Sequence, residues 1–286
     1  MPEATPRCLN NRTASLARHA FDWRRARGPA PGGLVRGVSK SLGQSRAIAR
    51  NQAPVGRKLC MLACICLLGC RPVAQPDPVQ AADEQVPWEE QVRQVREEHA
   101  IEIRYDVDPV HAAELLLLKD DCQLLRILEV NQDLIAAETV GEVLKSLPRL
   151  ERLKLTGPVS DEILLAVSKI PTLKILNLPN GEFSDNALRS IAGHPALELL
   201  RFHSPHVTDD GFASVSQIPH LRFLHVIDVP MTDAGLQHLS GLEHLESFYL
   251  DGGDCTEAGL SELIKRLPEL HFHWNQLHLP EDPRTH

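Results

Sequence analysis

The stretch PTLKILNLPNGEFSDNALRSIAGH, which starts at Pro171, is followed directly by PALELLRFHSPHVTDDGFASVSQI from Pro195 and by PHLRFLHVIDVPMTDAGLQHLSGL from Pro219. The three segments are each 24 residues long, and they place a proline, several leucines and a Ser/Thr-Asp pair at the same positions. A shorter unit precedes them from Pro148, and a unit one residue longer follows from Glu243. Repetition with a period of about 20 to 50 residues is typical of a solenoid built from stacked units.

Each unit carries the pattern of one strand followed by one helix. In the third unit, Leu224 and Val226 alternate with other residues, which predicts a short strand with every second side chain in the core. Thr232 and Asp233 follow a loop and are typical of a helix N-cap and an acid in the first helical turn. The same cap position is held in the other units by Ser160, Ser184, Thr208 and Thr256.

The pattern LxxLxLxxxxVTDxGLxxLxxLP resembles bacterial leucine-rich repeats and is similar to the repeats of F-box-type and cysteine-containing leucine-rich proteins. It covers residues 122–279. The resemblance implies an α/β leucine-rich repeat solenoid, with a parallel β-sheet on the concave side and helices on the convex side. One unit buries too little apolar surface to fold alone, so the units must stack. The asparagine that such repeats carry after the strand is replaced here by Pro158, Gly181, Pro205, Val229 and Gly253.

The flanking segments are less regular. Trp88, Val92 and Val95 are spaced as one face of a helix, so residues 87–121 are expected to form an N-terminal cap helix and a first strand–helix unit. A last strand is expected near the end of the repeats, before a polar tail over residues 280–286.

Residues 122–147 are expected to form a degenerate repeat. Leu124 and Ile127 take the leucine positions, and Glu129 then falls where a core residue belongs.

Charge divides the chain sharply. Residues 1–69 contain 12 Lys/Arg and 2 acids, a net charge of +10, whereas residues 70–286 contain 18 Lys/Arg and 36 acids, a net charge of −18. Such a break usually separates a tail or targeting segment from a folded body. Residues 1–54 have three interpretations: a disordered basic tail, a transit-type presequence, or translated upstream sequence that is absent from the functional protein. The last is favoured, because a secretion signal follows.

That signal is expected over residues 55–69. Arg57 and Lys58 precede ten apolar residues, Leu59–Leu68, as in a signal peptide. As a helix this run would be about 15 Å long, too short for the roughly 30 Å hydrocarbon core of a membrane. The ending before Cys70 resembles the lipobox of bacterial lipoproteins, which implies lipidation of Cys70. Residues 70–86 would be a flexible tether. The alternative is a short buried apolar run with incidental cysteines.

Motifs of catalysis are absent from the sequence: it contains no nucleotide-binding glycine motif, HExxH or GxSxG, and no cofactor is expected. Cys122 and Cys255 lie about five repeats apart, beyond disulfide reach, and both are expected to be packed thiols. His271, His273 and His278 invite a metal interpretation. No nearby cysteine or carboxylate completes a tetrahedral set unless Glu243 or Asp251 turns toward them, and no metal is expected.

Strand positions that point away from the core predict columns of side chains on the concave side. The middle column is expected to hold Lys154, Asn177, Arg201, His225, Tyr249 and Trp274, with His273 facing the core in the last unit. Aromatic and arginine side chains are common binding anchors. The predicted ligand-binding patch is therefore Arg201, His203, Phe223, His225, Tyr249, Asp251 and Trp274.

The sequence predicts a non-catalytic binding module in the cell envelope, lipid-anchored or secreted, which recognises a protein or surface ligand. The acidic body argues against nucleic acid as a partner, and membrane contact is expected only through the anchor. Two alternatives stay open: an intracellular adaptor of the F-box-like repeat type, located in the cytoplasm, and a hydrolase that uses His and Asp residues of the concave face.

Overall fold

The leucines expected to face the core form a continuous ladder in the computed structural model, which describes residues 85–275 and 277–278. Parallel strand pairing places Leu153 beside Leu176, followed by Leu200, Leu224 and Phe248. All five side chains are at most 1% exposed. The predicted strand register of these units is therefore confirmed. The expected basic segment, the signal, Cys70 and the polar tail lie outside the described residues.

The elements alternate between strand and helix along the chain. In order they are α1 (Trp88–Arg96), β1 (Glu102–Val110), α2 (Ala112–Leu115), η2 (Leu116–Lys119), β2 (Ile127–Gln132), α3 (Ala137–Lys145), β3 (Arg152–Leu155), α4 (Asp161–Val167), β4 (Ile175–Leu178), α5 (Asp185–Leu188), η3 (Arg189–Ile191), β5 (Leu199–His203), α6 (Asp209–Val215), β6 (Phe223–Ile227), α7 (Asp233–Leu239), β7 (Ser247–Asp251), α8 (Glu257–Arg266), β8 (His271–Trp274) and β9 (Leu277–His278).

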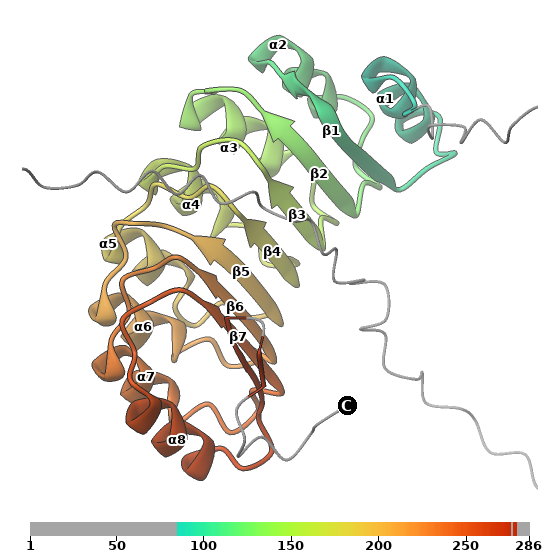
Figure 1. The fold of residues 1–286 in the computed structure, drawn as a ribbon. Helices are drawn as coiled ribbons and strands as arrows, with labels where there is room; N and C mark the ends of the chain where they lie inside the picture. The colour runs from blue at the N-terminus through green and yellow to red at the C-terminus, as the bar shows by residue number, and fades with distance from the viewer. Residues whose placement is uncertain (1–84, 276, 279–286) are drawn as a thin grey trace, which may run out of the picture. The chain divides into compact units, whose positions relative to one another are not determined.

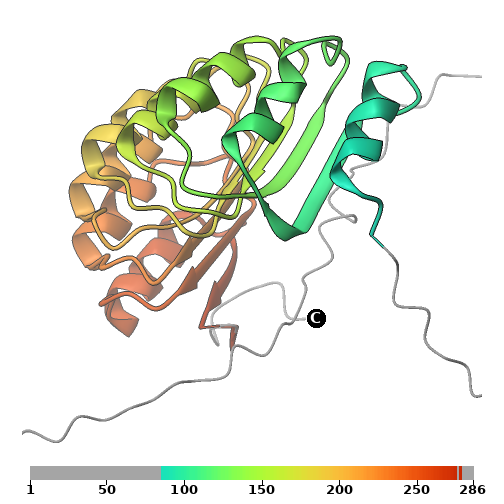
Figure 2. The same cartoon turned by 90° about the horizontal axis from the view of Figure 1, so that it is seen from above.

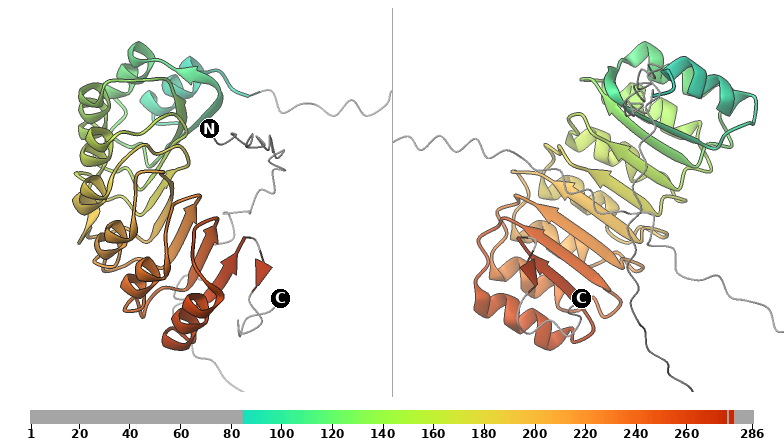
Figure 3. Two further views of the ribbon diagram at one scale, coloured as in Figure 1. Left: turned by 60° about the vertical axis from the view of Figure 1, so that its left-hand side comes forward. Right: turned by 45° about the vertical axis from the view of Figure 1, so that its right-hand side comes forward.

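Within the described residues, the strands form one nine-stranded sheet whose spatial order follows the chain from β1 to β9. Strands β1 to β8 are parallel, and β9 pairs antiparallel with β8. The helices line the outer side of the curved sheet, as Figure 1 shows and the view from above in Figure 2 repeats. No described helix covers the opposite face, which is seen from two directions in Figure 3 and is called the concave face below.

Consecutive helices are joined at their first residues by a carboxylate. Asp209, the first residue of α6, accepts hydrogen bonds from the backbone N–H of Thr232 (2.8 Å) and from its hydroxyl (2.6 Å), one unit further along. The same pair of bonds joins Asp161 to Ser184, Asp185 to Thr208 and Asp233 to Thr256. The acid therefore does more than complement its own helix dipole, because it also binds the cap of the next unit.

The glycine of the TDxG sequence is explained by these carboxylates. Gly235 donates its backbone N–H to Asp209 at 3.0 Å. A Cβ atom at Gly235 would lie 2.6 Å from Oδ1 of Asp209, which is closer than non-bonded atoms approach. Gly211 and Gly259 face the carboxylates of the preceding units in the same way. The motif is thus a set of contacts between neighbouring units.

The loops after the strands do not need the missing asparagine. The carboxamide of Gln132 accepts a hydrogen bond from the Gly157 N–H (3.0 Å) and donates one to the Pro158 carbonyl (3.2 Å). The buried hydroxyl of Ser204 donates to the Phe183 carbonyl at 2.6 Å. Polar side chains at an earlier position thus satisfy backbone groups that would otherwise be buried without a partner.

The expected core position of Glu129 is wrong. The residues of this unit that face the core are Leu125, Leu128 and Val130, all at most 1% exposed. Glu129 points to the concave face, where its carboxylate pairs with Arg104 (2.5 Å) and Arg152 (3.4 Å). Adjacent apolar residues in this segment permit two registers, and the adopted one avoids burying an unpaired charge.

The first strand has its free edge partly covered by α1. This helix packs Trp88, Val92 and Val95 into the core, each at most 2% exposed. On its other side, the carboxamide of Gln91 accepts from the Arg104 N–H (2.9 Å) and donates to the Arg104 carbonyl (3.1 Å). One side chain thereby occupies backbone groups that an exposed edge strand would offer to another chain.

Across the described part of the chain, none of the helices combines the length and the apolar character needed to cross a membrane.

Candidate ligand-binding face

The parallel register arranges outward-facing side chains in rows across the concave face. The middle row is Arg104, Glu129, Lys154, Asn177, Arg201, His225, Tyr249 and His273. The row before it is Glu102, Ile127, Arg152, Ile175, Leu199, Phe223, Ser247 and His271. In the row after it, His203, Ile227 and Asp251 are neighbours. Six of the seven residues of the predicted patch therefore lie on this face.

The seventh residue, Trp274, is not part of the patch. Its strand partner is Leu250, and it packs against the hydrophobic core. His273, which was expected to face the core, instead takes the place beside Tyr249. The cause is a spacing of two residues between Leu270 and the core residue Phe272, where the other units have three. The last strand is therefore shifted by one residue relative to the expectation.

A relay of polar side chains crosses four strands at the centre of the face. The guanidinium of Arg201 donates from Nη1 to Asn177 Oδ1 (3.0 Å) and from Nε to His225 Nδ1 (3.2 Å). Because Nδ1 accepts in this arrangement, the proton of a neutral His225 lies on Nε2. Nε2 is 2.9 Å from Asp251 Oδ2 and donates to it. Each side chain in the relay is oriented by its neighbour.

Arg201 is a half-buried cation held by uncharged acceptors. It forms no ion pair with a carboxylate among the described residues, whereas Arg104 and Arg152 on the same face both pair with Glu129. Burial lowers the pKa of Arg201 from its ordinary value, and the charge of Asp251 offsets part of this effect. The centre of the face thus carries a positive charge that is only partly compensated.

Aromatic and imidazole rings continue the face toward its C-terminal end. The rings of His225 and Tyr249 lie 5.6 Å apart between centroids, and Tyr249 stacks on His273 at 4.4 Å with 10° between the planes. The ring of His271 meets His273 edge-on, with 2.7 Å between their Nε2 atoms. These rings form a continuous surface in which each ring is held in place by contacts with its neighbours.

An apolar row runs beside the relay. Leu199 lies between Ile175 and Phe223 on the neighbouring strands and is 6% exposed although it points outward. The guanidinium carbon of Arg222 lies 5.2 Å from the centroid of the Phe223 ring. This contact favours one orientation of the ring.

His203 is fixed to the edge of the patch. Its Nδ1 lies 2.9 Å from the carbonyl oxygen of Ile227. A carbonyl only accepts, so Nδ1 carries the proton and Nε2 is left as the acceptor of the ring.

The described residues contain no group of three or more His, Cys, Asp or Glu side chains arranged to hold a metal. His271 and His273 are close together, and His278 pairs through its backbone with His273 on the antiparallel strand. Cys122 and Cys255 are both buried free thiols, as expected. Burial raises the pKa of each thiol, in the case of Cys255 to about 12. Such thiols are poor nucleophiles at neutral pH.

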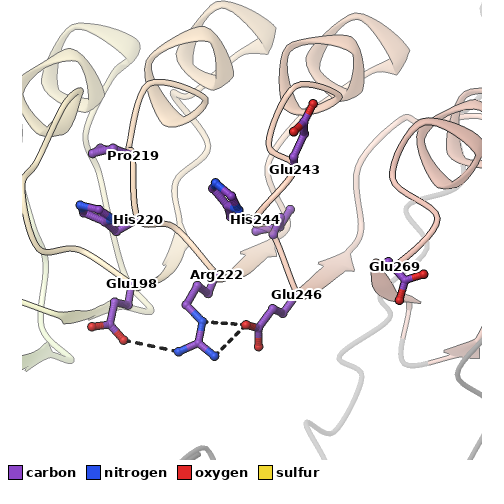
Figure 4. Close-up of a pocket in the computed structure, with 9 residues that line it drawn as sticks. Glu198, Pro219, His220, Arg222, Glu243, His244, Glu246 and Glu269 are labelled. Carbon is purple, nitrogen blue, oxygen red and sulfur yellow. Dashed lines mark hydrogen bonds and ion pairs between the residues drawn. The ribbon is translucent and has the colours of Figure 1, made fainter.

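A row of alternating charges along the edge of the sheet was not predicted. Arg222 lies between Glu198 (3.8 Å) and Glu246 (2.7 Å), as Figure 4 shows. Three units before Arg222, Glu151 pairs with Arg126 (3.3 Å) and with Lys174 (3.2 Å). The sequence does contain the corresponding pattern, because one position of the unit alternates between a basic and an acidic residue. Exposed pairs of this kind stabilise little individually.

The same edge bears a hollow of about 520 Å³. Its lining comprises Glu198, Pro219, His220, Arg222, Glu243, His244, Leu245, Glu246 and Glu269. Four of the nine lining residues are glutamates, and the lining lies on the loops that lead into the strands (Figure 4). The lining residues of the hollow precede the strands, whereas the residues of the predicted patch on this face lie on the strands themselves.

The sequence matches no protein-family profile and no curated protein. Among solved structures, the chain is similar to an internalin from Listeria monocytogenes, with 15% identity and a TM-score of 0.49 over 65% of this chain and 53% of the internalin chain. It thus spans about half the length of that chain. The strand order, the core ladder and the bonds between units come from this chain itself. They give it the architecture of an α/β leucine-rich repeat solenoid, with a parallel sheet on the concave side and helices on the convex side.

Proposed function

We propose that the chain is a binding module that recognises a protein or surface ligand through its concave face, without catalysing a reaction. The observation that carries this proposal is the relay from Asn177 through Arg201 and His225 to Asp251. Side chains that are already oriented lose little conformational freedom when a partner binds. The proposed contact residues are Arg201, His203, Phe223, His225, Tyr249 and Asp251.

Two features of the face support recognition rather than chemistry. The candidate residues are spread over the surface of a sheet that no described helix covers, whereas catalysis favours a concave site that excludes water. Arginine and tyrosine, which lie at the centre of the patch, are also enriched among residues that dominate binding energy.

The test is site-specific photo-crosslinking in the cells that naturally produce the protein. A photoreactive residue at Ile227 on the concave face is expected to form adducts with a polypeptide, whereas one at the exposed Gln237 on α7 is not. Phe223→Ala should reduce the adducts at Ile227 at least about fivefold, because truncating an anchor costs more than about 1 kcal/mol. Equal adducts from both positions, or adducts only from Gln237, would contradict the proposal.

We further propose that the binding module is anchored in the cell envelope through Cys70. The support is the sequence pattern of residues 55–69, which precede Cys70 as a signal peptide precedes a lipidated cysteine. Mass spectrometry of the mature protein should find Cys70 as a lipid-modified N-terminal residue, and Cys70→Ala should release the protein from membranes. A protein that retains residues 1–69 in the cytoplasm would instead favour the adaptor alternative.

A further inference from the structure

The centre of the concave face has an unusual charge for this protein. The outward-facing residues of β4, β5 and β6 include one arginine and no acid; they are Ile175, Asn177, Leu199, Arg201, Phe223 and His225, with His203 and Ile227 at one side. Residues 70–286 carry a net charge of −18, from 18 Lys/Arg and 36 acids. The acids are therefore concentrated elsewhere, and a single cation marks the middle of the face.

Hydrogen-bonding capacity remains on that cation. A guanidinium has five N–H groups, and within the described residues Arg201 uses two of them, one to Asn177 Oδ1 and one to His225 Nδ1. Both acceptors are uncharged, and they hold the plane of the guanidinium in place. The Nη2 group makes no hydrogen bond to a described residue, and it is not among the fully buried polar atoms that lack a partner. It can therefore donate to a ligand that approaches the face.

An apolar surface lies directly beside the cation. Leu199 is flanked by Ile175 and Phe223 on the neighbouring strands, in the row adjacent to Arg201. A partner seated on this face would meet an anion site and an apolar strip two residues apart along β5, about 7 Å.

We infer that Arg201 receives a carboxylate of the partner polypeptide, an Asp or Glu side chain whose apolar neighbours pack on the half-buried Ile175 and Phe223. This inference rests on the proposed function. Arginine binds carboxylates with paired, charge-assisted hydrogen bonds, and the fixed orientation of Arg201 favours that geometry.

A single carboxylate fits better than a polyanion. Asp251 lies at the end of the relay from Arg201, and the surrounding body is acidic. A phosphate cluster, a nucleic acid or a sulfated polysaccharide requires several cations. On this face Arg104 and Arg152 already pair with Glu129, which leaves Arg201 and Lys154 among the described residues. A single acid within an apolar peptide segment can still pair with Arg201, and its one negative charge is repelled only weakly by the acidic body of the protein.

The experiment uses the 286-residue chain as bait for a library of random 12-residue peptides displayed on phage. Peptides with Asp or Glu next to apolar residues are expected to be enriched on the wild-type chain. They should not be enriched on Arg201→Gln. The matched control is Arg152→Gln, which removes the same charge from the same face where Glu129 already pairs with it, and which should select the same peptides as the wild type.

A selected peptide is then synthesised with its acid and with the corresponding amide. The wild-type chain should bind the acid form at least about tenfold more tightly than the amide form. Arg201→Gln should bind both forms equally weakly, and Arg201→Lys should recover part of the difference. Circular dichroism and the thermal midpoint of each variant check that the fold is retained.

Other outcomes would overturn the inference. Selected peptides without acids, acid-containing peptides that bind Arg201→Gln as tightly as the wild type, or failure to enrich any acidic peptide would each do so. Competition by heparin or inorganic phosphate at the same site would point to a polyanion instead. If the selected peptides contain no acid but their binding is still lost in Phe223→Ala, the inference fails and the proposed function remains supported. Crosslinks confined to the convex side would contradict the proposed function itself.

Discussion

The carboxylate of Asp209 binds both the backbone N–H and the hydroxyl of Thr232, which caps the helix of the next unit. One side chain thus connects two units at their helix N-termini, on the opposite side of the core from the leucine ladder. Units of a solenoid depend on their neighbours for stability. In this chain, part of the stabilisation between neighbouring units comes from these hydrogen bonds, which occur four times along the described residues.

Gly235→Ala should destabilise the protein, although alanine is the better helix former by about 1 kcal/mol. The new Cβ would lie 2.6 Å from Asp209 Oδ1 and 2.5 Å from Met231 Cγ. We expect the free energy of unfolding to fall by about 1–3 kcal/mol, measured by urea denaturation. The control is Gly241→Ala, where a Cβ would have no neighbour within 4 Å and stability should be unchanged or slightly higher. Equal stability of the two variants would contradict the steric role of the glycine.

His194 should make the protein sensitive to acid. This buried residue stands where other units have Ile170, Ile218 or Leu242, and its Nε2 lies 2.9 Å from the Ile170 carbonyl oxygen. Burial lowers the pKa of His194 in the folded state. Below pH of about 6.5 the unfolded chain binds a proton that the native residue resists, so the free energy of unfolding falls as pH decreases.

The measurement for His194 is urea denaturation between pH 7.5 and 5. The stability of His194→Leu relative to the wild type should rise as the pH is lowered. The matched control is Ile218→Leu, at the equivalent position of the next unit, since neither side chain there binds a proton and the difference in stability should not vary with pH. A constant difference for both variants would refute the assignment.

Cys255 should have the opposite pH dependence. Burial raises the pKa of its thiol to about 12, and Sγ lies 3.3 Å from the Met231 carbonyl oxygen, to which it donates. Above pH of about 9 the unfolded thiol ionises while the native thiol keeps its proton, so stability falls as pH rises from 9 toward 12. Cys255→Val places at this position the valine that the equivalent position 207 holds. The stability of this variant should not show the fall between pH 9 and 12, because it has no thiol there to ionise. Denaturation of the two proteins at pH 8 and pH 10.5 measures it; parallel curves would count against the prediction.

Trp274 should affect stability and not ligand binding. Its side chain packs against the core beside Leu250, so Trp274→Ala should lower the free energy of unfolding by about 2–4 kcal/mol. The crosslinking yield at Ile227 should stay within about twofold of the wild type when measured well below the unfolding temperature. Tyr249→Ala is the contrasting variant, with a smaller loss of stability and a larger loss of crosslinking. The reverse pattern would restore Trp274 to the ligand-binding face.

The repeating part of the fold was predictable because its signals are local. Leu200 and Leu224 occupy the same place in two units of equal length, so aligning the units also aligns the strands. Thr232 and Asp233 identify a helix start by their chemistry alone. The bond from Asp209 to Thr232 was not predicted, since it joins residues 23 positions apart and depends on the distance between stacked units.

The errors arose where units depart from equal length or offer two registers. Phe272 follows Leu270 at a spacing of two, which turns Trp274 toward the core and His273 onto the concave face. Leu125 and Leu128 each stand next to another apolar residue, so the sequence pattern alone did not distinguish the two faces around Glu129. The position of Arg201 on the concave face was predicted. That it has no carboxylate partner among the described residues could not be, because this depends on where the side chains of three neighbouring strands lie.

The last described helix, α8, begins with Glu257, whereas the four helices before it begin with Asp161, Asp185, Asp209 and Asp233. Each of those aspartates binds the cap of a following unit, and no described helix follows α8. A unit inserted before Thr232 by gene duplication would bring its own aspartate to bind the next cap. A unit added after Arg266 would instead meet Glu257, whose side chain is longer than that of aspartate by one methylene group. Copy number in this array could therefore grow from the middle more readily than from the end.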